Sequence, residues 1–273
     1  MKKIFTVLMM VLLAAMLIVS CDNSSKEPAK TYTVSFDVNE GIGTFNPQTS
    51  DSNGKISKPT AIPSHTGWGF LGWSTVKDGT TAFNFETDTI TADTTLYAMW
   101  KKSYSVGDTG PAGGKIFYVV PESKGTKTSN YGEESLTWKY LEAASADLSE
   151  NYQWNTSDSY FGTSTGDAIG TGWSNTRILN SSTFAAAEAC RNYGNNSDYD
   201  DWFLPSQTEL AEVYNKRNDI GGFDCDATTG GYWSSSKDYY SSECIAYMIN
   251  FSNGVANTCG RTGSFHIRPI RAF

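Results

Sequence analysis

Short segments in which apolar and polar residues alternate recur along this chain from Thr31 onwards, and Gly, Asn, Asp and Thr separate them. In "TYTVSFDV" the alternation places every second residue, from Tyr32 to Val38, on one face, which is typical of a half-buried strand. The later segments "GWGFLGWST", "TAFNFETDT" and "TTLYAMW" have the same character. The chain is therefore predicted to be rich in short β-strands.

The first 21 residues, "MKKIFTVLMMVLLAAMLIVSC", have a different character. They combine two lysines, an apolar segment and small residues before a cysteine, which are the features of a secretory signal. The apolar segment, Ile4 to Val19, is shorter than the roughly 18 to 20 residues needed to span a bilayer. We therefore predict export for residues 1–21, with a permanent membrane helix as the weaker alternative.

The end of this segment, Ile18-Val19-Ser20-Cys21, resembles a bacterial lipobox, in which Cys21 becomes the lipidated first residue of the mature chain. The alternative is an ordinary signal peptide with an incidental cysteine. Two or more acyl chains would hold an otherwise soluble protein on a membrane. Residues 22–30 have no apolar periodicity and are predicted to be a tether. We expect an exported protein that is anchored to the bacterial membrane, at the outer membrane or the cell surface.

The charge balance argues against one class of partner. Removal of Lys2 and Lys3 with the signal would leave 19 basic residues against 29 acidic ones, a net charge of −10. Nucleic acid is therefore not an expected partner, since its binding depends on basic groups that neutralise phosphates. Aromatic residues make up 14% of the chain and charged residues only 18%, a balance that suits β-rich extracellular domains.

Four cysteines follow Cys21, and no CxxC or Cys/His spacing typical of zinc sites joins them. An even number in an exported protein predicts disulfides, with three possible connectivities. We favour a Cys244–Cys259 pair because Cys244 precedes one predicted strand and Cys259 follows its hairpin partner. Cys190 and Cys225 are then left as the second pair by elimination alone.

Three segments of the N-terminal half carry a family resemblance. Residues 32–38, 67–73 ("GWGFLGW") and 96–100 ("LYAMW") are similar to the InlB B-repeat, also called the Listeria-Bacteroides repeat. The resemblance covers residues 31–101 and implies a small β-grasp-like module, often a spacer in surface proteins. We predict that Trp68, Trp73 and Trp100 serve as core or rim packing rather than as ligand contacts.

Two helices are predicted in the remaining 170 or so residues. The first lies within residues 174–194, where Ile178, Phe184, Ala187 and Cys190 recur near helical spacing. The second begins at Ser206, with Glu209 three residues later to form a capping box. The other segments are predicted as strands and loops, so the fold class is α+β.

A second resemblance rests on six segments that occur in order: "VGDTGPAGGKIFY", "WKYLEAASADL", "IGTGWSNT", "DWFLPSQTEL", "GGYWSSS" and "RPIRAF". They are similar to the Lcl C-terminal domain family and cover residues 103–273. The resemblance implies a variant of the C-type lectin fold, with two helices and a mixed, mainly antiparallel sheet. It also implies kinship with formylglycine-generating enzymes and with diversified ligand-binding proteins; most members have no assigned biochemical activity.

The last quarter of the chain predicts four strands, at residues 232–236, 245–251, 255–258 and 265–271. Odd-numbered residues from Ile245 to Phe251 form the predicted core face, and a hairpin turn follows at residues 252–254. If these strands are consecutive and antiparallel, loops 237–243 and 259–264 lie at one end of the sheet. The candidate ligand-binding residues there are Lys237, Asp238, Tyr239, Tyr240, Glu243, Arg261 and Ser264. Tyrosine beside serine and glycine is a composition that suits the recognition of a ligand. Trp233, in the first of these strands, is predicted to be a core residue.

Catalysis is disfavoured by the residues available. The chain has two histidines, His65 and His266, so a nucleophile has few possible bases. His266 remains a candidate catalytic base only by elimination. Cys244 and Cys259 could suggest the oxidative chemistry of formylglycine-generating enzymes, but the catalytic motif of that family is missing, and a structural disulfide is the favoured interpretation.

Two further segments permit a functional and a structural interpretation. Asp198, Asp200 and Asp201 place carboxylates close enough for calcium, although the spacing is not that of an EF-hand. Asp201 could instead cap a turn before the second helix. The glycine-rich residues 107–114 lack the GxxxxGK[ST] pattern of a phosphate loop and are explained by a turn. We predict no bound metal and no cofactor.

Three classes of function remain open. The leading one is a non-catalytic, membrane-anchored surface lipoprotein whose C-terminal domain binds an extracellular protein or glycan. The second is a structural or envelope-assembly lipoprotein that binds other bacterial proteins, and the third is an enzyme. The family resemblance implies sulfated-glycan binding in some members. Residues 102–273 contain 13 basic and 20 acidic residues, so long-range repulsion opposes a polyanionic ligand here.

Overall fold

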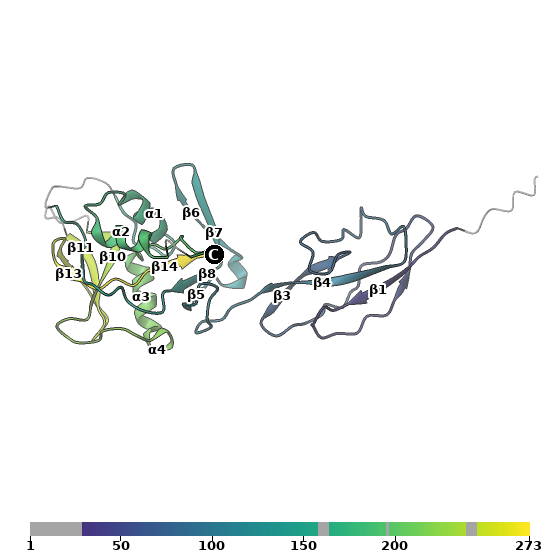
Figure 1. The fold of residues 1–273 in the computed structure, drawn as a ribbon, viewed down its shortest axis with the longest axis horizontal. Coiled ribbons are helices and arrows are strands. Elements are labelled where there is room, and N and C mark those ends of the chain that lie inside the picture. Colours follow the sequence, from purple (N-terminus) through teal and green to yellow (C-terminus); the bar gives the residue numbers. More distant parts are fainter. Residues whose placement is uncertain (1–28, 158–163, 195–196, 239–244) are drawn as a thin grey trace, which may run out of the picture. The chain divides into compact units, whose positions relative to one another are not determined.

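The structure is a computed structural model, which describes residues 29–157, 164–194, 197–238 and 245–273. The chain divides into two compact units, the first ending at Lys101 and the second comprising Lys102–Phe273. Figure 1 shows a first unit built of strands and a second that combines strands with helices, so the predicted α+β class is confirmed. No helix in the described ranges is both long enough and apolar enough to span a membrane.

The first unit contains one four-stranded sheet with the order β2-β1-β4-β3. The strands are β1 (Thr33–Asp37), β2 (Gln48–Thr49), β3 (Trp68–Ser74) and β4 (Thr94–Lys102). The sheet is mixed, because β1 pairs in parallel with β4 and antiparallel with β2. Its core contains Val34, Trp73 and Leu96, with Tyr32, Phe36 and Val38 packed against them. The alternation in "TYTVSFDV" therefore predicts the buried face correctly.

The three tryptophans of this unit differ in their surroundings. Trp73 is only 2% exposed and belongs to the core. Trp100 is half-buried, and its Nε1 donates to the carbonyl oxygens of Val38 at 3.1 Å and Asn39 at 3.0 Å. Trp68, in contrast, is 41% exposed. Core or rim packing is thus confirmed for Trp73 and Trp100, whereas Trp68 presents a large apolar surface to solvent.

The second unit contains several small sheets in place of one mixed sheet. One has the order β14-β8-β5, another β10-β11-β12, and the pairs β6-β7 and β13-β9 complete the set. All of these strand pairings are antiparallel, and an isolated parallel bridge joins Tyr232 to His266. The strands are β5 (Lys115–Val119), β6 (Lys127–Tyr131), β7 (Glu134–Trp138), β8 (Tyr140–Ala143), β9 (Tyr152–Gln153), β10 (Gly231–Lys237), β11 (Ile245–Asn250), β12 (Val255–Gly260), β13 (Ser264–Phe265) and β14 (Ile270–Ala272).

The segment predicted as the first helix forms two separate helices, α1 (Gly172–Ile178) and α2 (Ala185–Asn192). The break falls at "LNSST", residues 179–183, where the hydroxyl of Ser181 accepts from Thr183 N–H at 3.4 Å and lies 3.1 Å from the hydroxyl of Thr183. Asn, Ser and Thr favour such local hydrogen bonds over a continuous helix. Phe184, Ala187 and Cys190 pack in one apolar cluster and Trp173 of α1 packs in another, so the apolar spacing across residues 174–194 spans two helices.

The second predicted helix is confirmed as α3 (Gln207–Asn215). Ser206 is its N-cap, and the capping box with Glu209 is complete. Leu210 and Val213 are buried against the main core of this unit. A further short helix, α4 (Arg217–Ile220), and a 3₁₀ turn, η1 (Glu122–Lys124), complete the helical elements of the described ranges.

Strand β11 is buried on both faces, which differs from the prediction. Ile249 and the following Phe251 pack in one apolar cluster, while Ala246 and Met248 pack in a second cluster on the opposite face. Trp233 of β10 also belongs to the second cluster and is fully buried, so its predicted core role is confirmed. The core-face prediction for residues 245–251 was wrong in assigning only one face, because helices and loops cover both.

The last predicted strand, residues 265–271, divides into β13 and β14, which belong to different sheets. Pro269 lies between them and has no N–H to donate to a ladder. The chain therefore leaves the partner of β13 and reaches β8, where Ile270 pairs with Ala143 and Ala272 pairs with Leu141.

Candidate functional site

The glycine-rich segment at residues 107–114 wraps around a buried carboxylate. Glu142 of β8 is fully buried, and its Oε1 accepts a hydrogen bond from Gly114 N–H at 2.7 Å. Its Oε2 accepts from Ala112 N–H at 3.4 Å and lies 3.2 Å from Nη1 of Arg271. The N–H groups of this turn are therefore directed at a carboxylate of the protein itself.

This arrangement explains the glycines. A side chain at Gly110 would collide with the Glu142 carboxyl group, and one at Gly114 would collide with the backbone carbonyl oxygen of Ala143. The segment is thus a turn that leads into β5, as predicted, and it holds Glu142 where a phosphate loop would hold an anion.

Arg271 joins this cluster to the acidic segment near residue 200. Its Nε lies 2.7 Å from Oδ1 of Asp201 and its Nη2 lies 2.9 Å from Oδ2, which is a bidentate ion pair. Asp201 therefore binds Arg271 and does not cap a turn before α3, which corrects that interpretation. The described ranges contain no group of three or more side chains suited to a metal, and Asp198 and Asp200 are exposed.

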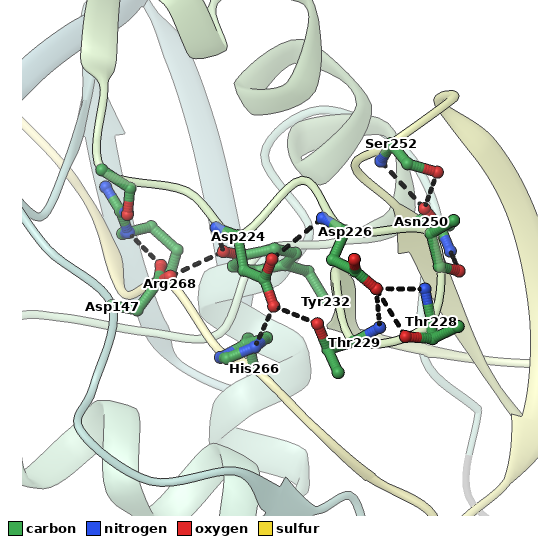
Figure 2. Close-up of polar contacts among 12 residues, drawn as sticks. Asp147, Asp224, Asp226, Thr228, Thr229, Tyr232, Asn250, Ser252, His266 and Arg268 are labelled. Carbon is green, nitrogen blue, oxygen red and sulfur yellow. Dashed lines mark hydrogen bonds and ion pairs between the residues drawn. The ribbon is translucent and has the colours of Figure 1, made fainter.

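A second buried arginine organises the loop at residues 221–230, as Figure 2 shows. Arg268 is fully buried; its Nε donates to Oδ1 of Asp147 at 2.6 Å, and its Nη2 donates to the carbonyl oxygen of Gly222 at 2.6 Å. The hydroxyl of Tyr232 donates to Oδ2 of Asp147 at 2.6 Å and accepts from Asp224 N–H at 2.7 Å. Burial and the adjacent Asp147 raise the pKa of Tyr232, so this phenol is a structural hydrogen-bond donor.

His266 belongs to the same network. Its Nε2 lies 3.3 Å from Oδ2 of Asp224, and its ring stacks on Tyr232 with the centroids 5.2 Å apart. Asp224 also accepts from the Thr229 hydroxyl at 2.6 Å and from Asp226 N–H at 2.9 Å, and these bonds hold the pKa of its carboxyl below the usual range. Figure 2 places His266 beside this loop, where it supports the loop through Asp224.

The ends of the strands near the predicted ligand-binding loops lie where the sequence predicts. Lys237 of β10 is opposite Ala246 of β11, and Ile245 is opposite Gly260 of β12. The segments that follow Lys237 and Gly260 therefore start at one end of this sheet, and the turn at residues 251–254 is at the other. The strand order and directions agree with the prediction.

Two residues that were predicted to contact a ligand at this end are buried, so the prediction that they lie at the surface is wrong. Lys237 is only 7% exposed and Arg261 only 2% exposed. Lys237 N–H donates to the hydroxyl of Thr165 at 2.8 Å. Asp238 is half-buried and Ser264 is exposed. The other three candidates, Tyr239, Tyr240 and Glu243, lie outside the described residues.

The predicted Cys190–Cys225 disulfide is not formed. Cys190 is a free thiol fully buried in α2, where burial raises its pKa, whereas Cys225 is a free, exposed thiol in the loop at residues 221–230. Cys259 is also free and lies opposite Ala246. Because Cys259 is free, the predicted Cys244–Cys259 disulfide is not formed either. Cys244 and the lipidation candidate Cys21 lie outside the described residues.

One pocket of the second unit joins several of these elements, and we call it the hairpin pocket. It has a volume of about 360 Å³ and lies beside the β6–β7 hairpin, α1 and α2. Its floor includes Trp202, which is 5% exposed. The other residues that line it are Tyr131, Glu134, Arg177, Asn180, Arg191, Asp200 and Asp201.

The two arginines of the hairpin pocket are held in place by the fold. Arg177 Nε lies 2.9 Å from Oε2 of Glu134, and its guanidinium is 3.8 Å from the centroid of the Trp173 ring. Arg191 Nη1 donates to the carbonyl oxygens of Thr176 and Leu179, both at 2.8 Å. Groups that are fixed before a ligand arrives lose less conformational entropy on binding.

Sequence reasoning missed the hairpin pocket. Arg177 directly follows the "IGTGWSNT" segment and Trp202 belongs to "DWFLPSQTEL", so two segments of the family resemblance meet here. Their proximity depends on long-range packing that no local pattern reveals. Tyr131 stands at the end of β6 with 38% of its surface exposed, which is an ordinary exposure for a hairpin tyrosine and gives no signal by itself.

Comparison with known proteins agrees with the two resemblances. Residues 32–99 match the family model of the Listeria-Bacteroides repeat domain. Residues 89–271 match that of the Lcl C-terminal domain, a region that contains both arginine networks and the hairpin pocket.

Two proteins of Evansella cellulosilytica are similar to parts of this chain. One, named "Putative Gly-rich membrane protein", is 36% identical over 99 residues, which are 36% of this chain and 11% of that protein. The other, named "Putative membrane protein", is 41% identical over 69 residues, which are 25% of this chain and 10% of that protein. The chain thus spans about a tenth of the length of these relatives. Because the family model covers most of its residues, the chain belongs to the Lcl C-terminal domain family.

Proposed function

We propose that this protein is a bacterial surface lipoprotein whose C-terminal unit binds an extracellular glycan or protein without catalysing a reaction. The observation that carries the proposal is the hairpin pocket. An exposed tyrosine, two fixed guanidinium groups, an amide and carboxylates line this one pocket, and such convergent polar groups beside an aromatic surface are typical of ligand sites.

The lining of the pocket favours a ligand with many hydroxyl groups. Arg177 and Arg191 offer donors, and Glu134 and Asp200 offer acceptors, so the opening carries both signs of charge. A polyanion would gain from the arginines but would be repelled by the carboxylates and by the net charge of −7 of residues 102–273. A neutral glycan, or a polar segment of a host protein, fits this balance better.

Tyr131→Ala and Arg177→Ala are each expected to weaken ligand binding by about tenfold, which corresponds to about 1.4 kcal/mol. The first removes an exposed aromatic surface and the second removes a fixed guanidinium. Ligands would be found by screening the full chain on a glycan array and on immobilised extracellular matrix proteins, and affinities would then be measured by surface plasmon resonance.

Lys139→Ala is the matched control, because Lys139 also forms a surface ion pair, with Glu122 at 2.6 Å, but lies outside the pocket. It should bind like the unmodified protein. If all three variants bind equally well while Tyr239→Ala or Tyr240→Ala abolishes binding, the ligand occupies the loops after β10 and the pocket assignment is refuted.

The proposal that the protein catalyses no reaction is supported by the contacts that its titratable groups make within the fold. His266 lies against Asp224 and Tyr232, and Glu142 accepts hydrogen bonds from the turn at residues 107–114. Glu209 accepts hydrogen bonds from Gly170 and Ser206. Each is engaged in holding the fold, and a turnover assay that detected a reaction dependent on one of them would contradict this part of the proposal.

The proposed membrane anchor rests on the lipobox-like sequence Ile18-Val19-Ser20-Cys21. The names of the two relatives describe membrane proteins, which is consistent with a membrane location. Cys21→Ser is expected to move the protein from the detergent phase to the aqueous phase in a Triton X-114 partition. Mass spectrometry of the unmodified protein should show a diacyl or triacyl group on Cys21. An N-terminus elsewhere, without lipid, would contradict the anchor.

The envelope-assembly alternative makes a different prediction for whole cells. A surface protein is cleaved by protease added to intact cells, whereas a protein on the inner side of the envelope is protected until the cells are lysed. Protection in intact cells, together with co-purification of another envelope protein, would favour the alternative.

A further inference from the structure

A groove of about 510 Å³ lies on the first unit, which the family resemblance presents as a spacer. Trp68 contributes to its wall and is 41% exposed. Leu71 contributes as well and is 56% exposed. The groove therefore offers a large aromatic surface to solvent within a concave site, which core packing does not explain.

The aromatic wall is rigid because three rings support one another. The ring of His65 stacks on Trp68 with an interplanar angle of 15° and a centroid distance of 5.5 Å. The rings of Trp100 and His65 form a T-shaped pair with their centroids 5.3 Å apart, and Trp100 Nε1 donates to the carbonyl oxygens of Val38 and Asn39. The stacking on His65, which Trp100 supports in turn, therefore fixes the orientation of the Trp68 ring.

The rim of the groove is held in a strained backbone conformation. Within the described ranges, the non-glycine residues with positive φ are Asn39 at 44°, Glu40 at 70° and Asp78 at 58°, and all three line this groove. A left-handed conformation costs a residue such as glutamate of the order of 1 kcal/mol or more, whereas Asn and Asp adopt it at a lower cost. Asn39 Nδ2 donates to Oδ1 of Asp78 at 3.0 Å, so the two strained turns are tied together across the rim.

The rim carries groups that suit hydroxyl ligands. Glu40, Lys77 and Asp78 are exposed and place acceptors and a donor around the aromatic wall. One face of a sugar ring is an apolar array of C–H groups, while its hydroxyls project around the ring edge. A flat indole with polar groups beside it matches that pattern, and the mixed charges favour a neutral sugar over a polyanion.

From these observations we propose that the groove of the first unit is a carbohydrate-binding site, in which a neutral sugar ring stacks on Trp68 and its hydroxyls bond to Glu40, Asp78 and Lys77. This site is separate from the hairpin pocket and does not depend on the function proposed for the second unit. The first unit is then a second binding module of the protein in addition to any role as a spacer.

The test is a titration of the full chain with cellohexaose, chitohexaose and maltohexaose, followed by tryptophan fluorescence and by calorimetry. At least one of these neutral oligosaccharides is expected to bind, and Trp68→Ala should weaken that binding by about tenfold or more. Ile62→Ala is the matched control, because Ile62 is 75% exposed on the same unit but does not line the groove. It should leave the affinity within about twofold of the original.

The variant Glu40→Gly distinguishes a role of the rim in ligand binding from a role in stability alone. Glycine adopts φ near 70° without strain, so this variant should melt at the same or a higher temperature than the unmodified protein. It should nevertheless bind the oligosaccharide more weakly, because the rim carboxylate is gone. A role limited to structure would not move stability and affinity in opposite directions.

Several results would overturn the inference. These are the absence of binding to all three oligosaccharides, binding of heparin alone, or equal affinity of Trp68→Ala and Ile62→Ala. Loss of oligosaccharide binding in Arg177→Ala with no change in Trp68→Ala would place the sugar in the hairpin pocket. That result would refute this site while supporting the function proposed for the second unit.

Discussion

Arg271→Ala is expected to lower the free energy of unfolding of the second unit by about 3–5 kcal/mol, because it leaves buried charge without a partner. Arg271 is 5% exposed and binds Asp201 through two atoms and Glu142 through a third. Its removal leaves the fully buried Glu142 with only the N–H groups of the turn at residues 107–114 as partners. The measurement is urea denaturation followed by tryptophan fluorescence.

Arg177→Ala provides the comparison for this result. Arg177 also pairs with a carboxylate, Glu134, but both side chains are substantially exposed, so its loss should cost about 1 kcal/mol or less. The double variant Arg271→Ala with Glu142→Gln should lose less than the sum of the two single variants, since they act on one contact. Equal and small losses for Arg271→Ala and Arg177→Ala would show that the buried cluster contributes no more than a surface pair.

The second unit should become less stable as the pH rises from about 4.5 to about 7, by up to about 3 kcal/mol, because of Glu209. Burial raises the pKa of this carboxyl from 4.5 to about 7, although N–H groups of Ser206, Gly170 and Gly172 oppose the shift. The folded state therefore binds a proton that the unfolded state has released. The contribution is complete below pH 4.5 and is lost as the pH rises through 7. Denaturation at several pH values measures it.

Glu209→Gln isolates this effect from the other titrating groups. Glutamine preserves the capping box of α3 but has one acceptor oxygen for the N–H groups of Gly170 and Ser206, so below pH 4.5 the variant should be less stable by about 1–3 kcal/mol. Because glutamine does not ionise, its own contribution should not vary with pH. The difference in stability between the two proteins should change across pH 4.5 to 7. A constant difference would mean that the N–H donors keep Glu209 ionised throughout.

The parts of the fold that depend on neighbouring residues could be predicted from the sequence. The Ser206–Glu209 capping box, the burial of Val34 and the directions of β10, β11 and β12 each follow from residues a few positions apart. Both family assignments were also possible, because each rests on ordered local segments. The break between α1 and α2 was missed because apolar spacing continued across a polar turn.

The site residues depend on contacts between distant segments and were predicted less well. Lys237 and Arg261 look like surface residues in a polar loop, yet the fold buries both. Asp201 stands in an acidic run that suggests calcium, but its partner Arg271 is 70 positions away. The hairpin pocket similarly joins Tyr131 to Asp200. A charged residue in the sequence does not reveal whether its counter-charge will come from a ligand or from the protein itself.

The pairing of β8 with both β5 and β14 makes closure of the second unit's core a late step in folding. Arg271 of β14 lies 129 positions after Glu142 and 70 positions after Asp201 in the sequence. A chain synthesised from its N-terminus therefore contains β5, β8 and both acids before it contains the arginine that joins them. Until β14 is added, the centre of the domain lacks one of its strands and the cation between two acids. A product truncated before β14 should therefore remain sensitive to proteases.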